Sequence, residues 1–518
     1  MNSQAVLAEN SKLKTEIETL KVQNSELHKQ LSWLIEQLKL GKKREFGASS
    51  EKSEYDFAQL MIFNEAEYFA KPEIVEPKIA IIKEHRRKTR LTTDKLPPDI
   101  PIEIVEHTLC ESEKVCPECD DPLHRIGKEK VRDELKIIPA KAIVVQHVRH
   151  SYGCRKCEME AEVPTIIKAP TPAPVIKGSF ASAESVAHVM VQKFVMGTPL
   201  YRQEKEFERN GVLLSRQTMS NWLIKATEDW LEPVYNLLHK QLLGRELLLA
   251  DETEFQVLKE PGRSAQQKSY LWVYRTGNDG LPPIVLSEYQ PGRGREHPKK
   301  FLSNYSGYLH TDGWEAYHKL PEVTIVGCWA HARRKFDEAL KTLAPKDREG
   351  TNAHRGKQYC DRLFETERRL ADLTADERFK QRLKFAQPLL DEFHAWLSSF
   401  KDLGKSAFCR AVKYSLDQWK YLKNYMLDGR LEISNNRTER TIKRFVIDRK
   451  NFLFANTPRG AHASAVIFSI IETALENNLN PFDYLVYIFK NAPNWNISQN
   501  PIIVEQLLPN TYRDSIAN

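Results

Sequence analysis

The sequence predicts a multidomain protein of the α+β class, and three observations support this prediction. The chain has 518 residues, enough for three to four domains of ordinary size. Helical patterns fill residues 6–38 and 179–240, whereas short strand-like runs follow one another from residue 245. Residues 330–430 then become helical, charged and leucine-rich. Strands followed by inserted helices are typical of an α+β core that carries a helical insertion.

The composition is that of a globular protein without a membrane anchor. Hydrophobic residues make up 41% of the chain and charged residues 28%. No apolar run approaches the roughly 18–20 residues of a membrane helix, and the N-terminus lacks a signal-peptide pattern. We therefore expect a cytoplasmic protein with no membrane partner. The net charge of +7 is mild for this length, so any basic surface depends on local clusters.

Residues 1–45 predict a leucine-zipper coiled coil. Ten positions alternate at spacings of four and three: Val6, Asn10, Leu13, Ile17, Leu20, Asn24, Leu27, Leu31, Leu34 and Leu38. Asn10 and Asn24 fall on a positions, where a buried asparagine fixes the register and favours a dimer. The alternative is an amphipathic helix packed on its own chain, but ten positions in register favour a homo-oligomer. Residues 46–104 are polar, contain a basic run and several prolines, and are expected to form a linker.

Residues 105–165 predict a four-cysteine zinc ribbon. Two CxxC pairs supply the ligands: Cys116, Cys119, Cys154 and Cys157. Each pair can turn two thiolates onto one ion, and two pairs complete a tetrahedral Zn²⁺ site. The spacer between the pairs contains strand-like stretches at Glu134–Ile138 and Ala142–Val148. A module this small has little core, so we expect the zinc to stabilise its fold.

Residues 179–240 predict a helical domain with a helix-turn-helix. Helices are expected at Ala183–Phe194, near Tyr201–Arg209 and from Ser215, which suits an N-cap position. The last of these helices exposes three side chains that can read base edges: Arg216, Gln217 and Asn221. Trp222 and Leu223 form its core face. The alternative is an ordinary helical hairpin.

Two aspartates lie at or near the ends of predicted strands in residues 245–460. In Leu247–Val257 a period of two places Asp251 on the apolar face and Glu252 on the wet face. A carboxylate on a buried face is costly unless it is paired or bound to a metal. Asp312 closes the strand-like run Gly307–Asp312. The alternatives are a solvated strand-end aspartate at 251 and a plain Asp-Gly turn at 312.

A third carboxylate, Glu439, lies on a predicted basic helix that begins near Ser434 as N-cap. Glu439 then shares the core-side face with Ile442 and Val446. The alternative is a glutamate that only forms salt bridges on the helix surface. Three carboxylates that meet at one point can hold two divalent cations, and oxygen ligands favour Mg²⁺ or Mn²⁺ over zinc.

The order of these features resembles bacterial transposases of insertion sequence family 66 over nearly the whole chain. The matching stretches are CPEC…CRKC, KFVMGTPLYRQEKEFERNGVLLSRQTMSNW, ADETEFQV, HTDGWEAY, GCWAHARRKF, EISNNRTERTIKRFVIDRKNFLF and NNLNPFDYL. The resemblance implies a leucine zipper, a zinc-binding domain, a helix-turn-helix and an RNase H-like catalytic core. One departure is Ser434, where the family often has Asp.

The resemblance implies that Asp251, Asp312 and Glu439 are the catalytic residues and the Mg²⁺ ligands of an Asp-Asp-Glu active site. It also implies a helical insertion at about 337–430 within the core and a C-terminal helical element at 461–518. The expected activity is binding of terminal inverted repeats, cleavage of DNA 3′ ends and joining of those ends to target DNA. Expected partners are double-stranded DNA, further copies of the chain and accessory proteins encoded by the same element.

In this interpretation basic residues of the core contact DNA phosphates. They are Arg333, Arg334, Arg440, Lys443, Arg444, Arg449 and Lys450. Arg449 and Lys450 are equally compatible with a solvated helix end. We group His331 with them, although a core cysteine at 328 and a positioning histidine at 331 are the structural alternative; two such ligands do not complete a zinc site.

Two other functions are compatible with the sequence. One is a catalytically inactive, transposase-derived regulator that only binds DNA, and the intact acidic triad argues against it. The other is an RNase H-like, structure-specific nuclease without strand transfer. The predicted zipper, ribbon and helix-turn-helix favour sequence-specific binding of element ends instead.

Overall fold

The computed structural model describes residues 141–153, 166–401, 404–495 and 501–517, together with Ile104, Asp121 and Ile497. The predicted zipper, nearly all of the predicted linker and the four CxxC cysteines lie outside these residues, so those interpretations stay predictions. Within the described residues, no helix combines the length and hydropathy that a membrane span requires.

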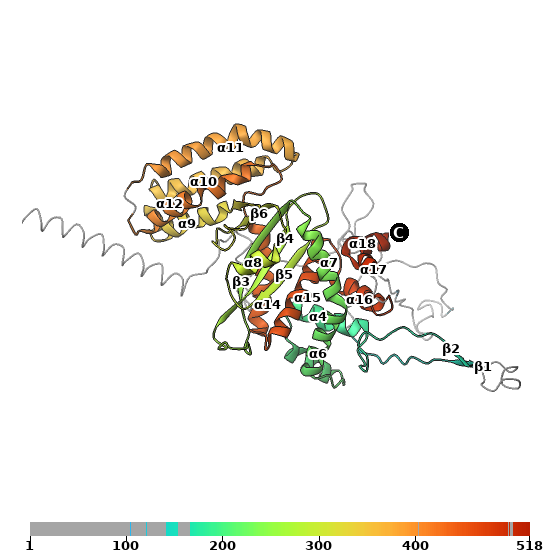
Figure 1. The fold of residues 1–518 in the computed structure, drawn as a ribbon. Coiled ribbons are helices and arrows are strands. Elements are labelled where there is room, and N and C mark those ends of the chain that lie inside the picture. The colour runs from blue at the N-terminus through green and yellow to red at the C-terminus, as the bar shows by residue number, and fades with distance from the viewer. Residues whose placement is uncertain are drawn as a thin grey trace, which may run out of the picture. The chain divides into compact units, whose positions relative to one another are not determined.

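The described chain is α+β, with two sheets and many helices (Figure 1). The strands are β1 (Ser151–Gly153), β2 (Ile166–Lys168), β3 (Leu247–Gln256), β4 (Lys268–Thr276), β5 (Val285–Gln290), β6 (Gly307–Thr311) and β7 (Val323–Gly327). The helices before and within the large sheet are α4 (Ala183–Phe194), α5 (Leu200–Arg209), α6 (Arg216–Ala226), α7 (Glu232–Leu243) and α8 (Glu296–Phe301). A π-helical turn, Thr227–Leu231, joins α6 to α7.

The helices after β7 fall into two groups. The first group is α9 (Trp329–Lys341), α10 (Asn352–Arg369), α11 (Ala375–Ser398), α12 (Ala407–Asp417) and α13 (Trp419–Leu422). The second group is α14 (Asn436–Phe452), α15 (Pro458–Glu476), α16 (Pro481–Asn491), α17 (Pro501–Val504) and α18 (Pro509–Ala517). Short 3-10 turns occur at Pro345–Asp347, Lys423–Met426 and Glu505–Leu507.

The strand-like runs predicted from residue 245 form one mixed, five-stranded sheet of order β5-β4-β3-β6-β7. Strands β3, β4 and β5 are antiparallel neighbours, whereas β6 joins β3 in parallel and β7 joins β6 in parallel. Leu249 of β3 stands opposite His310 of β6. The carboxyl ends of β3 and β6 therefore meet at the same edge of the sheet.

Both faces of the sheet are covered. Leu248 and Ala250 of β3 pack in a core with helices α4, α6, α7 and the C-terminal helices. Phe255 of the same strand and Val257, directly after it, pack in a second core with α14 and α15. The edge strand β5 is protected by α15, because Val285 N–H donates to Thr473 Oγ1 and Ser287 N–H donates to Ser469 Oγ.

The helices predicted before the sheet are present in the structure. Helix α4 has the predicted bounds, and Ser182 forms a capping box at its start. Ser215 caps α6 by accepting a hydrogen bond from Thr218 N–H. Trp222 and Leu223 are buried, as expected for the core face of α6.

The helices α9–α13 form a separate aromatic-rich core that reaches the sheet at Leu247 and Val326. Arg382, which is 1% exposed, donates to the Glu367 carboxylate and to backbone carbonyls at Tyr425, Asp428 and Leu431. These bonds fix the end of the helical segment just before α14 begins.

The strand prediction at Ala142–Val148 is wrong, because these residues are exposed and pair with no described strand. A short two-stranded sheet forms further along the chain, where β1 and β2 pair antiparallel with Tyr152 opposite Ile167. The apolar alternation of 142–148 lacks a described partner surface, and pairing rather than propensity decides where a strand forms.

Candidate active site

Asp251 and Asp312 come together at the shared edge of β3 and β6. Asp251 lies two residues beyond the paired Leu249, and Asp312 directly follows β6. Carboxylate oxygens of Asp251, Glu252 and Asp312 all lie within 4.8 Å of one another. Backbone N–H groups orient two of them: Glu252 N–H donates to Asp251 Oδ1 over 2.8 Å, and Trp314 N–H donates to Asp312 Oδ1 over 2.9 Å.

The pKa of Asp251 is raised in these surroundings. Burial, followed by the charges of Asp312 and Glu252, holds the pKa of the Asp251 carboxyl well above its ordinary value. Glu439 adds a smaller contribution of the same sign. The three carboxylates are therefore held together at an electrostatic cost, as expected for a site that binds cations.

The prediction that Glu252 lies on a wet face is wrong. Its side chain is 1% exposed because Tyr317 and Arg293 cover it, whereas Glu254, two residues further along the same face, is exposed. Tyr317 Oη donates to Glu252 Oε2 over 2.7 Å, and Arg293 Nε donates to Glu252 Oε1 over 2.6 Å. Burial and Asp312 raise the pKa of Glu252, while Tyr317 and Arg293 lower it, and the raising effects prevail.

Helix α14 is attached to the sheet directly beside Asp251. The N-cap residue is Asn435 and not the predicted Ser434, which is buried and lies one residue before the cap. Asn435 Nδ2 donates to the carbonyl of Ala250 over 3.0 Å, and Asn435 N–H donates to Cys328 Sγ over 3.2 Å. The tertiary bonds of Asn435 thus decide the helix start and place Glu439 in its first turn.

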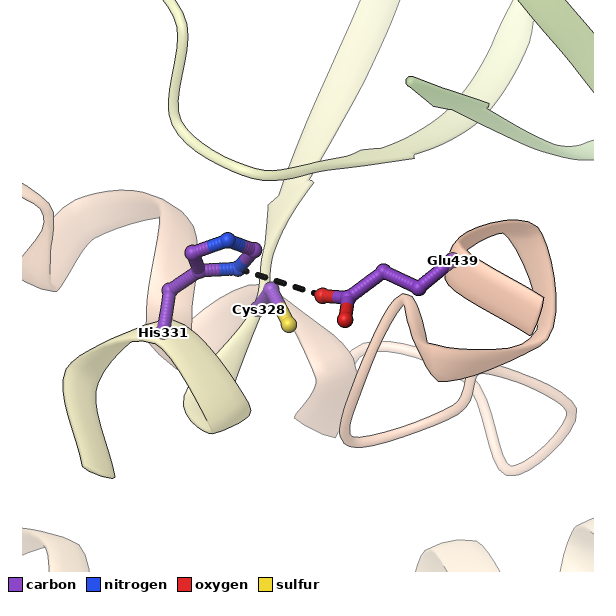
Figure 2. A group of neighbouring side chains, drawn as sticks. All are labelled: Cys328, His331 and Glu439. Atoms are coloured by element: carbon purple, nitrogen blue, oxygen red, sulfur yellow. Dashed lines mark ion pairs between the residues drawn. The ribbon is translucent and has the colours of Figure 1, made fainter. Parts of the chain in front are cut away.

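Glu439 belongs to a second cluster with Cys328 and His331, whose ligand atoms also lie within 4.8 Å of one another. Figure 2 shows the His331 ring and the Glu439 carboxylate pointing toward each other from two helices. His331 Nδ1 and Glu439 Oε1 are 3.8 Å apart. Arg334 Nη2 lies 3.3 Å from Glu439 Oε2, and Arg334 Nη1 donates to His331 Nε2 over 3.3 Å.

This second cluster is poorly suited to a metal ion of its own. Arg334 already places a positive charge against Glu439 and fills the acceptor nitrogen of His331. Burial raises the pKa of the Cys328 thiol to about 12, which disfavours the thiolate that a metal needs. Burial also lowers the pKa of His331, with Glu439 opposing this shift. The cluster is better described as the surroundings that orient Glu439.

The predicted basic residues have different environments. Arg440 and Lys443 are exposed on α14. Arg444 Nη1 donates to Glu472 Oε2 over 2.8 Å, and Arg333 Nε donates to Asp361 Oδ1 over 2.5 Å. At the end of α14, Lys450 is exposed and Arg449 half-buried.

The three base-reading candidates of α6 are exposed side by side. Arg216 lies on the first turn, where its N–H donates to Glu204 Oε1 of α5 over 3.0 Å. Gln217 Nε2 donates to Asn221 Oδ1 over 3.2 Å on the next turn. Their exposure matches the expected recognition face, and the contact between Arg216 and Glu204 ties the two helices together.

Three family models match parts of the chain. The model of the transposase IS66 family matches residues 178–463. The zinc-finger binding domain of transposase IS66 matches residues 113–158, which include all four CxxC cysteines. A third model, described as transposase C of IS166 homeodomain, matches residues 33–105.

Three similar proteins come from Sinorhizobium fredii (strain NBRC 101917 / NGR234), and each is described as uncharacterized. Protein y4jD is 30% identical over 412 residues, covering 76% of this chain and 78% of the relative. Protein y4hP is 29% identical over 426 residues, covering 78% and 74%. Protein y4qI is 28% identical over 516 residues, covering 95% and 91%.

Proposed function

Because the chain belongs to the IS66 family of transposases, we propose that it cuts the ends of an insertion sequence and joins them to target DNA. The observation that carries this proposal is the meeting of Asp251 and Asp312 at adjacent strand ends. Glu439 lies in the second cluster, on a helix that Asn435 ties to the residue before Asp251, and we propose that it acts with the two aspartates. The sheet order and the position of these carboxylates support an RNase H-like core for residues 245–460.

We propose Asp251, Asp312 and Glu439 as the residues that hold divalent cations. Their donor set fits the group, because oxygens of Asp251 and Asp312 lie close together and carboxylate oxygens suit hard cations. The chemistry that Mg²⁺ or Mn²⁺ supplies when bound is activation of the attacking oxygen and stabilisation of the leaving oxygen. Asn435 and the two backbone N–H donors keep the carboxylates oriented for that task.

The proposed reaction has two steps with the same bond changes. In cleavage, a water oxygen bonds to phosphorus as the P–O3′ bond breaks, and the proton released by water ends on the displaced 3′ oxygen. The other strand end keeps a 5′-phosphate. In joining, that 3′-hydroxyl oxygen bonds to a target phosphorus and its proton passes to the displaced target 3′ oxygen.

Other parts of the chain would supply DNA recognition and assembly. The exposed face of α6 suits base reading, and Arg440 and Lys443 suit phosphate contacts. Four thiolates from Cys116, Cys119, Cys154 and Cys157 would hold structural zinc, in agreement with the matched zinc-finger domain. The heptads of residues 1–45 would pair protomers that hold two DNA ends.

The test is a cleavage and joining assay with labelled DNA from the ends of the protein's own locus. We expect nicks at the element ends that require Mg²⁺ or Mn²⁺ and leave 3′-hydroxyl ends. The Asp312→Asn variant should lose them, whereas Glu254→Gln, which removes an exposed carboxylate of the neighbouring strand β3, should not. Specific binding without any nick, even with the accessory proteins of the element, would favour a DNA-binding regulator.

A further inference from the structure

The loop before α8 carries an arginine that is fixed beside the acidic cluster. Trp272 Nε1 donates to the carbonyl of Gly292 over 3.3 Å, and Arg263 Nη1 donates to the carbonyl of Pro291. Trp272 is fully buried in the sheet, so its hydrogen bond anchors the loop to the sheet. Arg293 is thereby presented at a fixed position and not on a freely moving segment.

Three contacts hold the Arg293 side chain. Its Nε and Nη2 atoms both bind Glu252 Oε1, and its guanidinium lies 4.0 Å from the centre of the Trp314 ring. Trp314 in turn donates its backbone N–H to Asp312 Oδ1. One arginine is therefore connected, through Glu252 and Trp314, to both sides of the carboxylate cluster.

The guanidinium keeps donors available despite these contacts. Its side chain is 36% exposed, and the two Nη1 hydrogens meet no acceptor within the described part of the chain. A planar guanidinium that is pre-oriented by stacking loses little side-chain entropy when it binds a phosphate. The carboxylates would repel a DNA phosphate, so a fixed cation at their rim has a clear role.

We propose that Arg293 is a catalytic residue that contacts the scissile DNA phosphate, with Glu252 and Trp314 as the residues that position it. The proposal rests on the proposed function, since it assigns a partner to the same active site. As the attacking oxygen approaches phosphorus, negative charge on the non-bridging oxygens increases. The Nη1 donors stabilise that charge more than the charge of the ground state.

A purely structural reading assigns Arg293 only to the neutralisation of buried Glu252. The two readings differ in a double-mutant cycle with the near-isosteric change Glu252→Gln. If Arg293 only neutralises Glu252, its loss becomes harmless once Glu252 is uncharged. If Arg293 binds phosphate, its loss is costly in both backgrounds.

The experiment compares the wild-type chain with Arg293→Gln, Glu252→Gln and the double variant. We expect Arg293→Gln to slow end nicking by about 10²–10³-fold, Glu252→Gln by no more than about tenfold, and the double variant to match Arg293→Gln. Arg293→Lys should nick faster than Arg293→Gln but slower than the wild type, because lysine keeps the positive charge but lacks the paired N–H donors of the guanidinium. Arg459→Gln, which breaks the exposed pair with Glu228, is the matched control for loss of one arginine–glutamate pair.

A second measurement is independent of the reaction. Binding of end DNA without divalent metal, followed against salt, should lose about 0.9 from its logarithmic slope in Arg293→Gln. The proposal is overturned if the double variant regains the rate of Glu252→Gln, or if Arg293→Gln nicks as the wild type does with an unchanged slope. A wild-type chain that never nicks overturns the proposed function itself, and this inference with it.

Discussion

The side-chain amide of Asn435 donates a hydrogen bond to the carbonyl of Ala250 over 3.0 Å, with Asn435 fully buried. Ala250 is the residue directly before Asp251, and Asn435 begins the helix that carries Glu439. Two residues 185 positions apart are thereby joined directly beside Asp251 of the proposed active site. This bond is the link between the strand-borne and the helix-borne carboxylates.

Asn435→Ala should therefore weaken both stability and activity. Removal of the amide leaves the buried Ala250 carbonyl without its partner, at a cost of about 1–3 kcal/mol. We expect this loss in the free energy of unfolding measured with urea, and a nicking rate reduced beyond the loss of folded protein. Asn436→Ala, at the exposed neighbouring position, should cost less than about 0.5 kcal/mol; an equal cost would contradict the assigned role of Asn435.

Magnesium should stabilise the wild-type chain through the acidic cluster. A ligand that binds only the folded state adds about 2.7 kcal/mol when present at 100 times its Kd. Asp251→Asn removes one of the crowded charges, so it should raise the melting temperature of the metal-free protein and abolish the further rise with Mg²⁺. Differential scanning calorimetry checks both effects, with Glu254→Gln as the control that keeps the wild-type response.

A buried acid pair at the junction of α14 and α15 predicts a pH dependence of stability. Burial, followed by the charge of Glu472, raises the pKa of Asp448 to about 7. Between about pH 4 and pH 7 the unfolded state has lost this proton while the folded state keeps it. The unfolded state then binds fewer protons, so stability falls as pH rises through this window.

Asp448→Asn should flatten that decline and stabilise the protein at pH 8 by roughly 1–2 kcal/mol. Urea unfolding at pH 5 and pH 8 measures the change. Lys450→Gln, an exposed change of charge one half-turn further along α14, should retain the wild-type decline. Equal slopes for the wild type and Asp448→Asn would show that another group causes the pH dependence.

The two proposed DNA-contacting surfaces should respond differently to substitution. Arg440→Gln and Lys443→Gln should weaken binding to all DNA sequences and each lower the salt slope by about 0.9. Asn221→Ala should instead reduce the preference for element ends over unrelated DNA, by about 1–3 kcal/mol per lost base contact. Fluorescence anisotropy at several salt concentrations separates the two, and Lys384→Gln, at an exposed position of α11, serves as the charge control.

Much of the fold could be predicted because its signals are local. The strands after residue 245 are short apolar runs. The predicted runs Leu247–Val257 and Gly307–Asp312 each end one residue beyond the observed strands β3 and β6. Ser215 was correctly placed as a cap, because an N-cap serine bonds to the backbone three residues ahead. Asp251 and Asp312 lie close together because adjacent parallel strands bring their carboxyl ends to one edge.

The errors share a physical origin in tertiary contacts. Glu252 was assigned to solvent by a period of two, but Tyr317 and Arg293 cover its side chain, while Glu254 on the same face stays exposed. Ser434 has the chemistry of a cap, yet the bonds of Asn435 to Ala250 and Cys328 start the helix one residue later. Arg293 lies in a glycine-rich loop that looks solvated in sequence, and only its spatial neighbours reveal its position.

The central claim is that Glu439 acts with the two aspartates as one metal-dependent site. The direct test is the nicking assay with Glu439→Gln, which keeps the size of the side chain and removes its charge. We expect full binding of end DNA, unchanged folding by circular dichroism and a nicking rate lowered by at least about 10³-fold in Mg²⁺ and Mn²⁺ alike. Nicking at the wild-type rate by this variant would show that Glu439 only forms salt bridges with Arg334 and His331, and would contradict the account.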